Sequence, residues 1–187
     1  MYYAMGYFPE TDLRAVEHLR RKYDPTVDLV GPHVTVMFPV PACAGEGALV
    51  RHVTSVLRRW KPFPIRLLGL RKSWDHWLFL VLEDGNEAVV KLYQEIYTGI
   101  LAEYRRDDLE FVPHLALGLF VKQGGDYEFT NPQQLAFDER RYQEALGEAE
   151  ALKLDYHCVV DKLHLLKLTK DFTRLVWRKR LPLSSAV

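Results

Sequence analysis

The sequence predicts an α+β fold that contains an internal duplication. Segments of alternating apolar residues, typical of β-strands, are interspersed with segments whose apolar residues recur at helical spacing. Two comparable series of strand, helix and strand follow each other, and each ends on a strand that begins with a proline-histidine pair, Pro32-His33 or Pro113-His114. Because repetition of this kind indicates duplicated units, we expect a single domain over residues 1–187 with two pseudo-repeat lobes.

The first lobe begins with a strand and a helix. Alternation over Tyr2 to Phe8 predicts the strand, and apolar residues at helical spacing predict a helix from about Asp12 to Tyr23. The strand of His33 follows, because Gly31-Pro32 interrupts the chain just before it. Helical spacing over Leu49 to Trp60 then predicts a second helix.

The second lobe repeats this order with a hairpin added. Two strand-like runs, Phe63 to Leu70 and Trp77 to Leu82, flank a short segment that has the length of a hairpin loop. Residues at helical spacing from Val89 to Ile100 predict the third helix. The strand of His114 comes next, so each histidine strand follows a helix.

The C-terminal part is expected to form one charged helix and further antiparallel strands. Asn131-Pro132 provides a cap and a first-turn proline for a helix that extends to about Ala151. Alternating apolar residues follow from Leu152 to Val160 and again from Leu175 to Leu181, on either side of an apolar run from Leu163 to Leu168.

Composition excludes several classes of protein. The 25 basic and 25 acidic side chains cancel, so no overall field attracts nucleic acid or an anionic membrane, and an anionic substrate has to be bound locally. No apolar run approaches the roughly 20 residues that span a bilayer, and the N-terminus lacks the features of a secretory signal. Cys43 and Cys158 lie far apart in the sequence and are expected to be free thiols. These features predict a cytoplasmic protein without a membrane partner.

The two proline-histidine strands carry the strongest functional signal. The first is Pro32-His33-Val34-Thr35-Val36 and the second is Pro113-His114-Leu115-Ala116-Leu117. Because the side chains of a strand alternate between faces, the histidine and the residue two positions later share one face, and the aliphatic residues face the core. The second copy has Ala116 where the first has Thr35.

At these residues the chain resembles the two-histidine (2H) phosphoesterases, a superfamily that includes 2′-5′ RNA ligase-like proteins and 2′,3′-cyclic phosphodiesterases. Segments 63–82, 160–166 and 177–183 also resemble family segments, so the resemblance covers most of the chain. It implies a bilobal, LigT-like α+β fold in which two antiparallel β-sheets face a central groove, with helices outside. It also implies hydrolysis of a 2′,3′-cyclic phosphate, at RNA ends or on small nucleotides, with reverse 2′-5′ ligation in some members and no metal or cofactor.

Opening a cyclic phosphodiester needs a base that takes a proton from water and an acid that protonates the departing ribose oxygen. Histidine suits both tasks, because its ordinary pKa of roughly 6.5 allows one ring to be neutral near pH 7 while the other is charged. We assign His33 and His114 to this pair and leave open which is the base, because the two titrate together. The resemblance implies that Thr35 donates a hydrogen bond to a phosphate oxygen, a contact that Ala116 cannot make.

Arg71 and Trp74 are further candidates for substrate binding. Both lie in or beside the predicted hairpin loop, where they could supply positive charge and a surface on which a base stacks. The remaining histidines show no metal-binding pattern, so no metal site is expected. No obligate protein partner is evident from the sequence.

The alanine at position 116, where the first motif has a threonine, leaves three functions open. The first is a metal-independent phosphoesterase that acts on RNA ends or nucleotides with a 2′,3′-cyclic phosphate. The second is a catalytically impaired nucleotide- or RNA-binding domain on the same fold. The third is a structural α+β domain without a ligand. Activity in His33→Ala, His114→Ala and Ala116→Thr variants would separate them.

Overall fold

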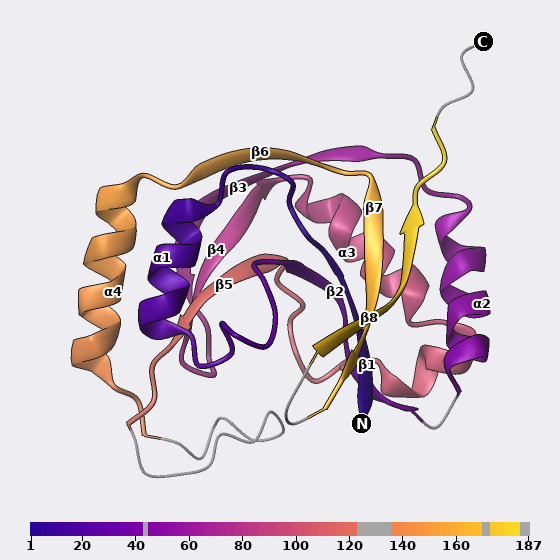
Figure 1. Cartoon of the computed structure of the whole chain (residues 1–187), viewed down its shortest axis with the longest axis horizontal. Helices are drawn as coiled ribbons and strands as arrows, with labels where there is room; N and C mark the ends of the chain where they lie inside the picture. Colours follow the sequence, from indigo (N-terminus) through magenta and orange to yellow (C-terminus); the bar gives the residue numbers. More distant parts are fainter. Residues whose placement is uncertain (43–44, 123–135, 170–172, 184–187) are drawn as a thin grey trace.

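The computed structural model describes residues 1–42, 45–122, 136–169 and 173–183 (Figure 1). Its centre is an antiparallel sheet in the order β6-β3-β4-β5-β2-β1-β7-β8, which curls like a half-barrel. Every strand expected from the sequence is present in this sheet, and with the helices this confirms the α+β class. The strands are β1 (Tyr2–Tyr7), β2 (Val34–Pro41), β3 (Phe63–Lys72), β4 (Trp77–Asp84), β5 (His114–Leu119), β6 (Asp155–Val160), β7 (Lys162–Leu168) and β8 (Thr173–Arg180).

The sheet consists of two halves that meet at the two histidine strands. One half holds β6, β3, β4 and β5, and the other holds β2, β1, β7 and β8. The register pair of Val34 with Leu115 joins β2 to β5. The two sheets expected from the sequence are therefore present as the two halves of one sheet, because the histidine strands approach closely enough at this pair to share backbone hydrogen bonds.

Helices pack against both halves (Figure 1). α1 and α4 lie together at the half that contains β5, and α2 and α3 lie together at the half that contains β2. α1 precedes β2 in the chain but packs on β5, and α3 precedes β5 but packs on β2. None of the described helices is long and apolar enough to span a membrane. The helices are α1 (Arg14–Tyr23), α2 (Glu46–Leu57), α3 (Asn86–Ile96) and α4 (Glu139–Leu152), with a 3-10 helix, η2 (Gly99–Tyr104), after α3.

The helices and the sheet enclose one hydrophobic core. Along the histidine strands, the aliphatic side chains of Val34, Val36, Leu115 and Leu117 are buried in this core. The residues between them, together with both histidines, lie on the opposite side of the sheet and are only half-buried. We call this side the histidine face. Simple alternation along two strands thus keeps the polar groups of both motifs accessible.

Two helices begin later than the sequence predicts. α1 starts at Arg14 rather than near Asp12, and the Asp12 carboxylate accepts a hydrogen bond from the Arg14 backbone N–H (3.1 Å). The expected cap at Asn131-Pro132 lies outside the described residues. α4 begins after Asp138, whose carboxylate accepts a hydrogen bond from the Arg141 backbone N–H (3.1 Å) and thereby serves as the N-cap.

A buried ion pair at the end of α1 holds the segment that leads to His33. Arg20 and Asp24 are 3% and 0% exposed, and their charged atoms lie 2.7 Å apart. Arg20 Nη2 also donates to the carbonyl oxygen of Val30 (2.8 Å). Asp24 accepts hydrogen bonds from the backbone N–H and the hydroxyl of Thr26, each at 2.7 Å. These bonds tie residues 24–30 to α1 immediately before the first histidine strand.

Candidate active site

The centre of the sheet brings the two histidine motifs together. Val34 pairs with Leu115, and the residues that flank them lie on the histidine face. Continuing this antiparallel register by one residue places Thr35 beside His114 and, in the other direction, the alanine of the second motif beside His33. The two imidazoles therefore lie on neighbouring strands, close enough that His33 contributes to lowering the pKa of His114.

Backbone carbonyl groups hold the two imidazole rings in the same way. His33 Nδ1 lies 2.9 Å from the carbonyl oxygen of Gly31, and His114 Nδ1 lies 2.6 Å from that of Val112. Because a carbonyl oxygen only accepts hydrogen bonds, we assign the proton of each neutral ring to Nδ1. Nε2 is then the basic atom of each ring, and it is the atom that can exchange a proton with a ligand.

An aromatic ring stacks on each histidine. Phe8, which follows β1, stacks on His33 with ring centroids 5.4 Å apart. Phe79 of β4 stacks on His114 with centroids 3.4 Å apart and an angle of 17° between the rings. Sequence reasoning missed Phe79, although alternation along β4 places it opposite the buried Leu78 and Leu80. The two stacks restrict the orientation of both imidazoles.

Gly6 of β1 leaves the space that the His33 ring occupies. A Cβ atom at this position would lie 3.2 Å from His33 Cδ2 and 3.2 Å from the carbonyl oxygen of Val34. Both approaches are tighter than most real Cβ contacts, so the ring or the Val34 carbonyl group would have to move by a few tenths of an ångström to admit a Cβ atom. Nothing in the sequence distinguished Gly6 from other glycines, because the need arises only when β1 and β2 pair.

Burial determines the protonation of the histidine pair. Desolvation lowers the pKa of both rings, and it lowers that of His114 from 6.5 to about 4, against a smaller opposing effect of its hydrogen bond to Val112. Without a ligand, both rings are therefore neutral near pH 7. This corrects the expectation that one of the two is charged near neutrality. An anionic phosphate between the rings would favour their charged form and raise these pKa values.

Only two of the three predicted substrate-binding residues lie on the histidine face. Thr35 lies on the histidine face. Arg71 also lies there, because it pairs with Phe79 across β3 and β4, and Phe79 pairs with Ala116. The Arg71 guanidinium forms an ion pair with Glu110 (3.1 Å). Trp74 lies in the turn after β3 and is 51% exposed, so it is not part of the row of residues that joins the two motifs.

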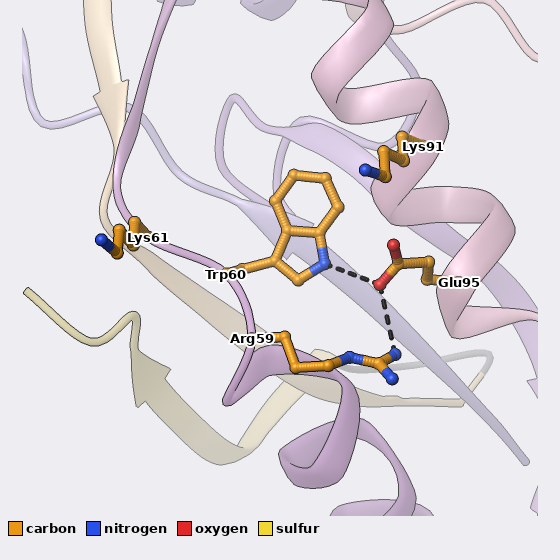
Figure 2. Close-up of a pocket in the computed structure, with 5 residues that line it drawn as sticks. All are labelled: Arg59, Trp60, Lys61, Lys91 and Glu95. Atoms are coloured by element: carbon orange, nitrogen blue, oxygen red, sulfur yellow. Dashed lines mark hydrogen bonds and ion pairs between the residues drawn. The ribbon is translucent and has the colours of Figure 1, made fainter. Parts of the chain in front are cut away.

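Two pockets of the described chain lie away from both histidines. One, of about 690 Å³, is lined by Arg59, Trp60, Lys61, Lys91 and Glu95 (Figure 2). Its side chains bond to each other, since Glu95 accepts hydrogen bonds from the Trp60 indole (3.0 Å) and the Arg59 guanidinium (3.3 Å). The other, of about 450 Å³, lies between β1 and the β3–β6 pair. Within the described residues, no group of three or more His, Cys, Asp or Glu is arranged to hold a metal ion.

Known proteins match the chain over most of its length. Two relatives named "Putative phosphoesterase", from Bacillus licheniformis and Halalkalibacterium halodurans, are 25% and 26% identical over 170 residues, which cover 89% of this chain and 89% and 88% of theirs. Escherichia coli LigT, solved with 3′-AMP, matches with a TM-score of 0.55 and 14% identity over 96% of this chain and 97% of its own. A solved structure described as a phosphoesterase matches with a TM-score of 0.57, 14% identity and the same coverage. These matches confirm the LigT-like fold.

A family model also matches most of the chain. The profile of the family described as the 2′-5′ RNA ligase superfamily matches residues 8–172, a range that contains both histidine motifs. Family and relatives together indicate a phosphoesterase. With two histidine strands paired at the centre of a LigT-like sheet, the chain belongs to the 2′-5′ RNA ligase superfamily of two-histidine phosphoesterases.

Proposed function

We propose that the protein hydrolyses 2′,3′-cyclic phosphates, at RNA ends or on small nucleotides, with weak 2′-5′ ligation in the reverse direction. The observation that carries this proposal is the pair of imidazoles on β2 and β5, each anchored through Nδ1 and each with Nε2 available to a ligand. A nucleotide as ligand is supported by the LigT structure solved with 3′-AMP.

In the proposed reaction, His33 and His114 transfer protons on opposite sides of the phosphorus. Nε2 of one ring takes a proton from water while the water oxygen bonds to phosphorus. The bond from phosphorus to one ribose oxygen breaks, and Nε2–H of the other ring protonates that oxygen. Each such transfer typically contributes about a hundred- to ten-thousandfold to the rate. The phosphate itself supports the acid, because its negative charge raises the pKa of a nearby imidazole.

Thr35 supplies a hydroxyl for a phosphate oxygen in this scheme, and its counterpart Ala116 supplies none. Ala116 also supports the second candidate function, a nucleotide- or RNA-binding domain with impaired catalysis. Arg71 lies two strands from Ala116 in the same row, on the side of the site where the hydroxyl is missing, and there it is paired with Glu110. The two functions differ in whether a bound nucleotide is turned over.

The direct test is hydrolysis of adenosine 2′,3′-cyclic phosphate, followed by chromatography with and without EDTA. We expect turnover that EDTA does not abolish, and we expect Ala116→Thr to exceed Ala116→Val by about tenfold or more in kcat, since removal of one preorganised donor typically costs this much or more. Valine is the control, because it has the shape of threonine without the hydroxyl. Binding without turnover in all three proteins would favour the second candidate, and abolition by EDTA would contradict the proposed mechanism.

The pH dependence of kcat/KM should reflect the lowered pKa values of the ligand-free pair. The productive form has one neutral and one charged imidazole, and its population is greatest between the two apparent pKa values of the pair. Both rings titrate below 6.5, and His114 does so near 4. We therefore expect kcat/KM to reach its maximum below pH 6.5 and to fall as pH rises through neutrality. A maximum at pH 7.5 or above would contradict this assignment.

A further inference from the structure

A third histidine lies on the histidine face, two strands from the first motif. Gly6 of β1 pairs with Thr35 on one side and with His164 of β7 on the other, and His164 pairs with Arg178 of β8. Residues paired across antiparallel strands share a face of the sheet. Thr35, Gly6, His164 and Arg178 therefore form one row. Neighbouring strands are spaced about 4.8 Å apart, so the backbone of His164 lies about 10 Å from the backbone of Thr35.

The His164 ring is packed against the active site. Its edge contacts Phe8, with ring centroids 5.1 Å apart, and the same Phe8 stacks on His33. His164 Nδ1 is buried, and the described residues provide no hydrogen-bond partner for it. Nε2 is then the nitrogen of His164 that can meet a ligand. Phe8 thus separates two imidazoles whose accessible nitrogens lie on the same face.

The charges around His164 leave a local excess of positive charge. Lys162 forms an ion pair with Glu10, and Arg180 forms one with Asp161 (3.8 Å). Arg178 is exposed and has no ion pair with any described residue. Desolvation lowers the pKa of His164, and the nearby positive charges of Arg178 and Lys162 lower it further. Arg178 is therefore a cation beside His164 that is available to an anion.

We propose that His164 and Arg178 bind a second phosphate group of the substrate, namely the 5′-phosphate of the nucleotide whose cyclic phosphate lies between His33 and His114. This inference rests on the proposed function. One ribose separates these two phosphates, and the ground between the first motif and His164 is covered by the His33 ring over Gly6 and by Phe8, whose ring contacts both imidazoles. Arginine provides paired N–H donors that match phosphate oxygens, and histidine Nε2–H adds a third donor. The preferred substrate class is then a nucleotide with a 5′-phosphate. The 3′-terminal nucleotide of an RNA chain has such a phosphate, which links it to the rest of the chain.

The test compares adenosine 2′,3′-cyclic phosphate with the same nucleotide carrying a 5′-phosphate. For the wild-type protein, we expect kcat/KM to be about tenfold or more higher for the 5′-phosphorylated substrate, since a charged phosphate gains charge-assisted hydrogen bonds. In Arg178→Gln and in His164→Leu, this ratio should fall toward one. Because the ratio is taken within each variant, a general loss of folded protein does not change it.

Arg174→Gln is the matched control. Arg174 lies on the same strand, but it pairs with Lys167 on the other face of the sheet, so the ratio should keep its wild-type value. A wild-type ratio near one, or a ratio that survives both Arg178→Gln and His164→Leu, overturns the second phosphate site and leaves the proposed function intact. If the wild-type protein hydrolyses neither substrate, the proposed function fails. In that case, the ratio of the dissociation constants of adenosine 3′-phosphate and adenosine 3′,5′-bisphosphate replaces the ratio of kcat/KM values. A wild-type ratio near one, or a ratio that survives both variants, again overturns the second phosphate site.

Discussion

Replacing either His33 or His114 by glutamine is expected to lower kcat for adenosine 2′,3′-cyclic phosphate by about a hundred- to ten-thousandfold. Glutamine is polar and similar in size to histidine but has no group that transfers a proton near neutral pH, so the proton transfer is lost with little change in side-chain volume. Because the two imidazoles act as a unit, the double variant should be only slightly slower than the slower single variant. Single-turnover kinetics, with folding checked by circular dichroism, measures both effects.

His52→Gln is the control for this experiment. His52 Nε2 also bonds to a backbone carbonyl, that of Ile96 (2.9 Å), but His52 belongs to α2 and lies away from the histidine face. Its substitution should leave kcat within about threefold of wild type, because no proton transfer depends on it. Retention of full activity in His33→Gln or His114→Gln would exclude that histidine as an acid or base.

Breaking the Arg20–Asp24 ion pair is expected to reduce the free energy of unfolding by about 3–5 kcal/mol. Asp24→Leu leaves the guanidinium of Arg20 buried without its carboxylate, and it also removes the acceptor of two hydrogen bonds from Thr26. Replacing both partners, in Arg20→Met with Asp24→Leu, should recover much of the loss, since no unpaired charge then remains in the interior. Urea unfolding followed by circular dichroism gives the three values.

The exposed pair of Arg14 with Asp12 provides the comparison. These side chains are 88% and 59% exposed, and surface pairs of this kind contribute about 0–1 kcal/mol. Arg14→Met should therefore have little effect on the urea midpoint. An equally small effect of Asp24→Leu would show that the Arg20–Asp24 pair does not stabilise the segment before His33.

The sequence alone was sufficient for the strands and for the central pair of motifs, because both depend on local patterns. Alternating or continuous apolar runs indicated every strand, and the repeated proline-histidine motif pointed to His33 and His114 before any geometry was known. The start of α4 could not be predicted from local patterns. A cap is a hydrogen bond made by one side chain, and both Asn131 and Asp138 are suitable residue types, so composition could not select Asp138.

The remaining features depend on contacts between strands distant in sequence. Gly6 and His164 become neighbours of Thr35 only through the pairing of β2, β1 and β7. The continuity of the two half-sheets likewise depends on the pairing of Val34 with Leu115, which no local pattern encodes. The pKa of His114 could not be foreseen either, because desolvation is a property of the assembled fold.

The placement of α1 on β5 and of α3 on β2 makes the two halves of the molecule dependent on each other. Each half of the sheet is therefore covered in part by the helix that precedes the histidine strand of the other half, so neither half completes its apolar packing alone. The pair of His33 and His114, which lies where the two halves meet, therefore depends on the packing of both halves.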